Sequence, residues 1–346
     1  MRRTTLLLRP TFVMRSLIAS LVLLVSAGTT VAQNRLPKYP MPKNGTLATL
    51  VREANLYANA DDSAGPIATI QPGRELVIAE RNGQWLRVFA NTDPPDTRES
   101  DRPEFTDSNA AQPISGWMLD KGIVNINTPH GDEILFGAAD EAEQQAAVPD
   151  PPPHVAEEAR LLYKRVAAMF PQSPWVGEAM FRAADIRWQM QKADAASLPS
   201  AHEKQSYLRE LMDEDEMKKI EKYFPGTRWA DLAAFDLIDN KLCGDWQGSE
   251  KCPEQETNYY LQYVDQHPNS PKAAEALYDA IYRQAAAGDM WQADGNRKGA
   301  DEDRGHAHAI FDRMEQKYPD SSFTARAASL LYKVDQGIPV YGSSRE

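Results

Sequence analysis

The chain has 346 residues, of which 25% are charged and 42% are hydrophobic, and its formal net charge is -12 at pH 7. This length is enough for two domains with separate cores, and both shares are ordinary for a globular protein. An acidic surface repels a phosphate backbone, so the composition argues against a nucleic-acid-binding protein.

Residues 1–32 predict a secretion signal peptide. They contain four arginines, no acidic residue and the apolar stretch LIASLVLLVSAG, followed by small residues. This stretch is much shorter than the roughly 20 residues that a membrane-spanning helix needs. We expect cleavage after Ala32 and a periplasmic or secreted product with no transmembrane segment. Residues 33–45 would then form a proline-rich leader.

Residues 46–130 predict a small all-β domain. Strand-like alternation appears in TLATLV, in PIATIQPGRELVIAERNGQWLRVFA and in ISGWMLDKGIVNI. The pair Asn82-Gly83 is the strongest hairpin signal, because a tight turn of matching twist needs positive φ at both central positions. The polar, proline-rich stretch at 91–113 predicts a long loop inserted between two strands.

This β segment resembles the bacterial SH3-like family, through LVREANLYANADDSAGPIATIQPGRELVIAERNGQWLRVFA and the closing GWMLDKGIV. The resemblance implies a small barrel, and modules of such families bind cell-wall peptides or proteins. We expect Trp85 and Trp117 to pack the barrel, with a ligand platform as the alternative. Arg52, Tyr57 and Arg87 either line a binding groove or form a solvated strand face.

Residues 131–154 predict a flexible, proline-rich linker. The stretch GAADEAEQQAAVPDPPP within them has few large apolar residues and ends in a proline run. Such a composition is typical of an extended, semi-rigid connection between domains.

Residues 155–336 contain a sequence repeat in four copies, FPQSPWVGEAMFRAAD, YFPGTRWADLAAFDL, QHPNSPKAAEALYDA and KYPDSSFTARAASLL. The shared proline ends one helix, because it removes a hydrogen-bond donor and restricts the residue before it. The Ser or Thr two positions later can accept a bond from a free N–H group and start the next helix. In two copies Pro174 or Pro271 is expected at the first helical position. The shared prolines are Pro171, Pro225, Pro268 and Pro319.

Small side chains follow each shared proline at helical spacing. Every copy has an alanine eight positions after the proline, and small or apolar residues five, nine and twelve positions after it share that helix face. Large side chains precede the proline by eight and five positions. We therefore expect a close antiparallel pair of helices in which large side chains meet small ones. The alanines are Ala179, Ala233, Ala276 and Ala327.

These copies resemble tetratricopeptide-like repeats, in the variant with YP-x-S-x-x-A at the turn that occurs in bacterial cell-envelope proteins. The resemblance implies an all-α solenoid of helical hairpins. The shared prolines are 54, 43 and 51 residues apart, compared with ~34 in a regular array. We expect insertions at 193–212, 243–256 and 288–305 to account for the excess. Residues 337–346 have no periodicity and predict a loose tail.

The two cysteines of the chain, Cys243 and Cys252, predict a structural disulfide. They lie nine positions apart in CGDWQGSEKC, and an exported chain meets oxidising conditions. Closing so short a loop contributes about 2–3 kcal/mol in the chain-entropy model. A metal site would need further ligands nearby, and a redox pair is usually closer in sequence.

The histidines at 306 and 308 follow an acidic DED sequence but do not predict a metal site. Their spacing places His306 and His308 on different faces of a helix, so we expect a solvated or capping role. The stretch DGNRKGADEDRG departs from a calcium-binding loop at Lys298 and Gly305. Common catalytic motifs are missing from the sequence, and we expect no enzymatic activity, metal or cofactor.

The sequence thus predicts a multidomain protein, with a small SH3-like β-barrel followed by a tetratricopeptide-like α-solenoid. We expect an exported, non-enzymatic binding or scaffold protein of the bacterial cell envelope. Its expected partners are other envelope proteins or cell-wall peptides. The alternative is a regulatory or targeting subunit of a cell-wall enzyme, or an enzyme without a recognisable motif.

Overall fold

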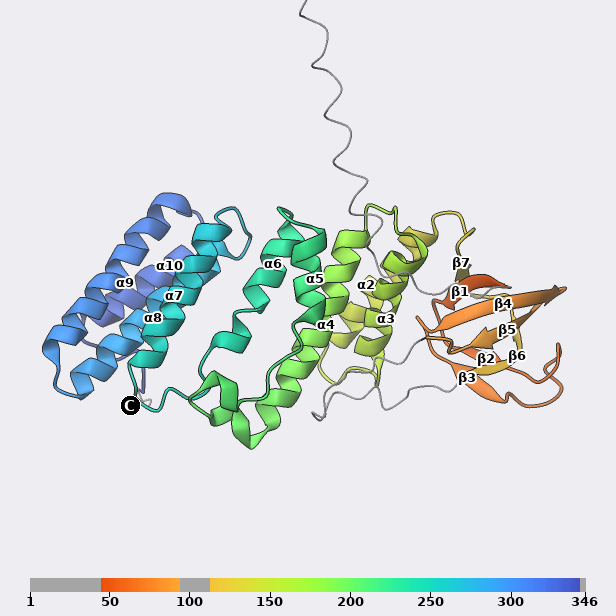
Figure 1. The fold of residues 1–346 in the computed structure, drawn as a ribbon, viewed down its shortest axis with the longest axis horizontal. Helices are drawn as coiled ribbons and strands as arrows, with labels where there is room; N and C mark the ends of the chain where they lie inside the picture. Colours follow the sequence, from red (N-terminus) through yellow and green to blue (C-terminus); the bar gives the residue numbers. More distant parts are fainter. Residues whose placement is uncertain (1–44, 94–112, 343–346) are drawn as a thin grey trace, which may run out of the picture. The chain divides into compact units, whose positions relative to one another are not determined.

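The computed structural model describes residues 45–93 and 113–342, which belong to one compact unit. They form a small antiparallel β region followed by an all-α region (Figure 1), and this order of classes confirms the coarse prediction. The predicted signal peptide, nearly all of the leader and most of the predicted 91–113 loop lie outside these residues. No helix in the described ranges is long and apolar enough to cross a membrane.

The β region has two antiparallel sheets. Five strands are arranged in the order β6-β5-β4-β1-β7, and β2 pairs with β3. A backbone bridge between Tyr57 and Trp117 joins the end of β2 to β6. Alternate side chains of the strands, among them Leu50, Leu76 and Met118, form a buried core. The strands are β1 Thr46–Leu50, β2 Ala54–Leu56, β3 Ala68–Ile70, β4 Glu75–Asn82, β5 Trp85–Ala90, β6 Ile114–Leu119 and β7 Ile123–Asn125.

The tight turn between β4 and β5 lies one residue later than predicted. Asn82 pairs with Trp85 in the strand register, so Gly83 and Gln84 are the central residues of the turn. Gly83 has a φ of 61°. A hairpin with glycine at its first central position needs positive φ there alone, which removes the need for Asn82 in the turn.

The α region contains nine α-helices within the described residues, together with three short 3-10 helices. Helices joined at the shared prolines lie side by side as the pairs α3–α4, α5–α6, α7–α8 and α9–α10 (Figure 1), which gives a solenoid-like arrangement. The α-helices are α2 Gly131–Ala146, α3 Val155–Met169, α4 Val176–Ser197, α5 Asp215–Tyr223, α6 Arg228–Asp236, α7 Lys251–Gln266, α8 Ala273–Ala293, α9 Arg297–Lys317 and α10 Ser322–Asp335. The 3-10 helices are η1 Pro199–His202, η2 Ser206–Leu208 and η3 Asp239–Lys241.

The turns at the four shared prolines have a common backbone geometry. In each one the residue before the proline follows the last residue of a helix, and its carbonyl oxygen accepts the N–H of the Ser or Thr, at 2.9–3.2 Å. The Thr227 hydroxyl then accepts the N–H of Ala230, and that of Ser321 accepts the N–H of Phe323. These two side chains are the helix caps that the repeat predicts.

Helices α4 and α8 begin slightly later than predicted. Pro174 and Pro271 lie in the turn, and the helices begin two residues later, at Val176 and Ala273. The preceding serine hydroxyls accept the N–H groups of Trp175 and Lys272 instead. The expectation that both prolines occupy the first helical position is therefore wrong.

The predicted burial of the repeat alanines is confirmed. All four alanines at the eighth position after the shared proline are fully buried, at 0% exposure. Three of the four large side chains eight positions before the proline, Tyr163, Met217 and Tyr260, are buried as well, and Phe311 is partly buried against the same core. Small side chains thus allow the paired helices to approach each other closely.

The flexible linker predicted over 131–154 is wrong for most of its length, because Gly131–Ala146 form helix α2. Leu135 and Ala139 are fully buried against α3. The hydroxyl of Tyr163 donates to a Glu143 carboxylate oxygen of α2 at 2.8 Å. Alanine has the highest helix propensity, and small side chains suffice where the partner helix supplies large ones.

The predicted insertions take different forms. Residues 193–212 contain η1 and η2, whereas the excess at 288–305 lengthens α8 and α9 to 21 residues each. The described part of the predicted loose tail is packed rather than loose. A carboxylate oxygen of Asp289 accepts the N–H groups of Val340 and Tyr341, at 2.6 and 3.2 Å.

Helix α3 joins the β region through a buried arginine. The Arg165 side chain is 3% exposed and donates to the carbonyl oxygen of Gly73 at 2.8 Å and to a Glu75 carboxylate oxygen at 3.1 Å. Arg165 also forms an ion pair with Asp93. The β region therefore shares a charged contact, as well as apolar packing, with the first repeat.

Candidate functional site

Four of the five side chains predicted on the β region lie on neighbouring strands. The rings of Tyr57 and Trp85 meet edge to face, with centroids 5.5 Å apart. Arg87 stands opposite Trp117 in the β5–β6 register and pairs with Glu80 at 3.2 Å. Tyr57 and both tryptophans are half-buried, so each ring both packs and remains accessible to solvent.

Arg52, the fifth predicted side chain, contacts a different part of the β region. Its guanidinium donates to the carbonyl oxygen of Glu53 at 3.2 Å. Its methylene groups lie against Gly122, whose missing Cβ would approach the Arg52 Cγ to 2.9 Å. The contacts of Arg52 therefore do not join it to the aromatic side chains.

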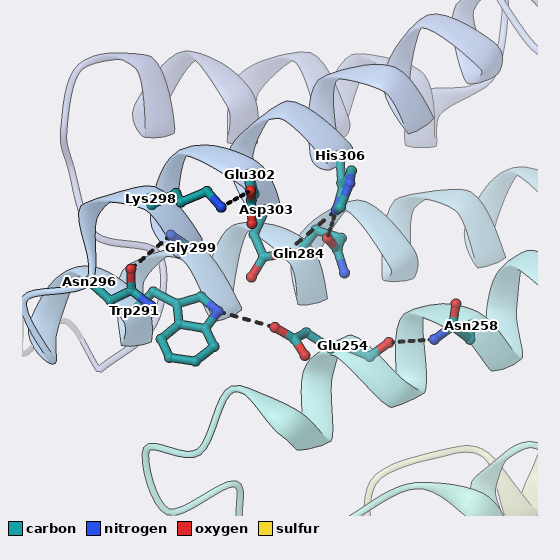
Figure 2. Close-up of a pocket in the computed structure, with 10 residues that line it drawn as sticks. All are labelled: Glu254, Asn258, Gln284, Trp291, Asn296, Lys298, Gly299, Glu302, Asp303 and His306. Atoms are coloured by element: carbon teal, nitrogen blue, oxygen red, sulfur yellow. Dashed lines mark hydrogen bonds and ion pairs between the residues drawn. The ribbon is translucent and has the colours of Figure 1, made fainter.

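A pocket of about 480 Å³ lies among α7, α8 and α9 (Figure 2). Most of the residues that line it come from the predicted insertions at 243–256 and 288–305, where the chain departs from the repeat. The lining residues are Glu254, Asn258, Gln284, Trp291, Asn296, Lys298, Gly299, Glu302, Asp303 and His306.

The turn between α8 and α9 forms one wall of the pocket. Asn296 caps α9, because its side-chain oxygen accepts the N–H of Gly299 at 3.1 Å. A Cβ at Gly299 would approach the Trp291 ring to 2.9 Å, so glycine leaves room for the indole against the first turn of α9. The Trp291 Nε1–H then donates to a Glu254 carboxylate oxygen at 3.1 Å and connects α8 to α7.

The disulfide lies at the beginning of α7. Cys243 and Cys252 are bonded, as predicted, with Cα atoms 6.1 Å apart. The buried Glu256 accepts the N–H of Cys243 at 2.8 Å and the Nε–H of Arg283 at 2.7 Å. These contacts attach the first turn of α7, which carries Glu254, to α8.

A hydrogen-bond chain fixes the orientation of His306. The amide nitrogen of buried Gln284 donates to the Thr257 hydroxyl at 3.2 Å, and that hydroxyl donates to the carbonyl oxygen of Pro253 at 2.8 Å. The Gln284 amide oxygen is therefore the acceptor that lies 3.2 Å from His306 Nδ1. His306 must carry a proton on Nδ1, which leaves Nε2 as an acceptor when the ring is neutral.

Asp303 is the buried acid of the pocket. Its residue is 5% exposed, and its Oδ1 lies 3.7 Å from His306 Nδ1. Its Oδ2 is buried, and no group of the described residues donates a hydrogen bond to it. Burial, followed by the nearby charge of Glu254, raises the pKa of Asp303 to about 6.

Several donors of the pocket already bond within the protein. The Trp291 indole and the Gln284 amide already donate within the protein, and an Asn258 N–H donates to the carbonyl oxygen of Glu254 at 3.1 Å. Lys298 pairs with Glu302 at 3.5 Å. Among the acceptors, Asp303 Oδ2 receives no hydrogen bond from residues 45–93 or 113–342.

The arrangement does not match a metal centre. Within residues 45–93 and 113–342, no group of three or more His, Cys, Asp or Glu side chains could hold a metal ion. His308 turns to Asp335, with Nε2 2.9 Å from a carboxylate oxygen, whereas His306 bonds Gln284. The separate surroundings agree with the predicted placement of the two histidines on different helix faces.

Sequence reasoning did not predict this pocket. It considered His306 and the neighbouring acids alone, whereas the lining side chains of α7 are about 50 residues away in the chain. The available signal was the excess spacing between shared prolines, together with a tryptophan and carboxylates inside the two insertions. A scan against protein-family models and a search of curated proteins both found no match for this chain.

Proposed function

We propose that the protein is an exported, non-enzymatic binding or scaffold protein of the bacterial cell envelope. In this proposal the β region is an SH3-like barrel and the α region is a tetratricopeptide-like solenoid. The observation that carries it is the set of four equivalent proline turns, each followed by a fully buried alanine. Hairpins that stack by such a rule present extended surfaces, which repeat proteins use to bind partners.

Exposed and half-buried side chains on one face of the β region support a binding role for that face. Tyr57, Trp85 and Trp117 are half-buried on adjoining strands, and the exposed Arg87 stands opposite Trp117. Phe89, which follows on the same face of β5, is 45% exposed. Tyrosine, tryptophan and arginine are enriched at the centres of protein interfaces. We propose this aromatic face as the docking surface for cell-wall peptides or envelope proteins.

Reversing one exposed charge tests this proposal. Purified protein would be sedimented with cell-wall sacculi, and a photo-activated cross-linker placed at Phe89 would report protein partners in the envelope. We expect Arg87→Glu to reduce the retained or cross-linked material at least about tenfold, the effect of a lost central contact. Lys121→Glu, the same charge reversal at the exposed β6–β7 turn, is the matched control and should change retention less than about twofold.

A wild-type protein that neither sediments with sacculi nor cross-links to an envelope protein would overturn the proposed function. Equal loss in Arg87→Glu and Lys121→Glu would show that only the overall charge matters, and would overturn the role of the aromatic face. A thermal melt of both variants verifies that they remain folded.

A further inference from the structure

We propose that the pocket among α7, α8 and α9 binds a primary alkylammonium group, of the kind carried by a lysine side chain or a free diamine. This inference adds a ligand chemistry to the proposed function. It rests on that function only in assuming that the α region is a binding surface.

The charges that face the pocket are mainly negative. Lys298 and Glu302 pair with each other at 3.5 Å, and their side chains are 86% and 60% exposed, so the two charges largely cancel. Glu254 and Asp303 remain, on α7 and α9, and Figure 2 shows their carboxylates directed toward each other across the pocket. Two acids that approach each other favour a cation between them.

The buried oxygen of Asp303 points independently to a missing donor. A buried acceptor without a hydrogen bond destabilises the folded protein, and the cost is larger for an ionised group. Asp303 Oδ2 has no donor among the described residues. Neighbouring Gln284 supplies none among the described residues: its amide nitrogen donates to Thr257 and its oxygen accepts from His306. A bound cation that carries N–H groups would satisfy the Asp303 carboxylate.

The acceptors come from two different helices, which suits an ammonium group. An ammonium has three donors and no acceptor. Glu254 on α7 uses one carboxylate oxygen for Trp291, and Asp303 lies on α9. An anionic ligand would be repelled by the Glu254 and Asp303 carboxylates. Within the part of the chain that the structure describes, the two acids also have no third protein ligand of the kind that a metal ion would require.

The indole of Trp291 supplies an apolar wall beside the carboxylates. Its ring is held by Gly299 on one side and by the hydrogen bond to Glu254 at its edge. Long basic side chains pack their methylene stems on apolar surfaces while the charged end reaches polar groups. A four- or five-carbon stem beside the indole would place its ammonium group near Glu254.

Calorimetric titration of the full chain tests the ligand class. The three ligands are N-acetyl-lysine methylamide, the isosteric N-acetyl-norleucine methylamide, which lacks the charge, and the free diamine cadaverine. We expect the lysine derivative to bind with a millimolar Kd or tighter, and the norleucine derivative at least about tenfold more weakly. Cadaverine as strong as the lysine derivative would assign the site to free amines, and a weaker cadaverine would assign it to lysine side chains of a partner.

Charge-removing variants locate the site. Asp303→Asn and Glu254→Gln keep the side-chain shapes and should each weaken the lysine derivative at least about tenfold. Glu315→Gln removes an exposed charge from α9 outside the pocket and should change the Kd less than about twofold. Circular dichroism of each variant verifies its helix content.

Equal affinity for the lysine and norleucine derivatives in the wild-type protein would overturn the proposal without any variant. An unchanged Kd in folded Asp303→Asn and Glu254→Gln would overturn the assignment to this pocket. These measurements use small ligands only. If lysine binding fails, the sacculus and cross-linking experiments still test the proposed function. If those experiments fail, the lysine-binding result for the pocket is unaffected.

Discussion

Asp303 shows how the surroundings of one side chain can distinguish it from other surface acids. The carboxylate is nearly fully buried and faces Glu254, and one of its oxygens has no hydrogen-bond donor in the described part of the chain. Each of these conditions disfavours the charged form. Strongly perturbed acids in pockets are candidates for functional sites. The sequence could not predict this, since neither the spacing to His306 nor the DED run reveals which acid is buried.

We predict that Asp303 lowers the stability of the protein as the pH rises from acid to neutral. Its pKa is about 6 in the folded protein, compared with 3.8 in an unfolded chain. Below about pH 3 the carboxyl is protonated in both states. At higher pH the unfolded state releases the proton first, so the free energy of unfolding falls until the folded state ionises at about pH 6. The total loss is about 3 kcal/mol at most.

The measurement is urea unfolding of the wild type and Asp303→Asn at several pH values from about 4 to about 7. The variant should become more stable relative to the wild type across this range. Asp236 and Asp279, whose pKa values are also raised by burial, titrate in both proteins and cancel in the difference. Glu254, His306 and Glu302, whose charges act on the carboxyl, are present in both proteins as well. Parallel pH profiles would show that Asp303 is not perturbed.

Among the elements, the proline-centred repeat was predictable and the first helix was not. The proline, the hydroxyl side chain and the alanine are each read from sequence by a local rule, so the boundaries of the repeated hairpins followed within a few residues. Helix α2 has no such turn, and its buried face is mostly small, as at Ala139 and Ala142. The large side chains of α3, such as Leu162, Tyr163 and Val166, make this face a packing surface.

We predict that leucine in place of the buried repeat alanines separates the paired helices. Overpacking a tight core typically costs about 1–3 kcal/mol. Ala233→Leu and Ala276→Leu should destabilise more than Ala327→Leu, because hairpins on both sides contact an interior repeat whereas α10 belongs to the last one. Urea or thermal unfolding of the full chain measures the midpoints.

Ala328→Leu is the matched control for this series. Ala328 follows Ala327 on α10 and is exposed, so the same added volume meets solvent and should leave the midpoint almost unchanged. If all three buried substitutions behaved like this control, close helix pairing at the alanines would be wrong. If Ala327→Leu lowered the midpoint the most, stability would not depend on contacts with hairpins on both sides, as it does in a solenoid.

At the scale of the whole molecule, the sequence divided the chain into two domains and a linker, but the β region packs directly on α3. Gly73 has a φ of 76°, and a Cβ there would lie 2.6 Å from the Leu161 Cβ. Arg165 reaches back from α3 to Gly73 and Glu75. In the sequence, Gly73 has the ordinary role of a turn glycine and Arg165 that of a helical arginine. Contacts between residues about 90 positions apart left no periodic signal to predict them.

The last prediction uses Gly73 to test whether the β and α regions unfold together. Gly73→Ala should destabilise the folded protein in two ways. The left-handed backbone conformation costs about 1–2 kcal/mol for a residue with a Cβ, and the added Cβ lies too close to α3. Gly226→Ala is the matched control, because its φ is 72° and nothing lies within 4 Å of the added Cβ. Only the Gly73 variant should therefore disturb the contact between the two regions.

Urea unfolding would be followed by hydrogen exchange of the backbone amides of the β region and by far-ultraviolet circular dichroism, which reports mainly on the helices. We expect the two signals to coincide in the wild type and in Gly226→Ala, since coincident transitions mark cooperative unfolding. In Gly73→Ala the signals should separate, because the β region would lose the support of α3 and the buried Arg165 would lose part of its hydrogen bonding. Coincident transitions in all three proteins, with equal midpoints for the two variants, would mean that the contact between the β region and α3 does not couple their folding.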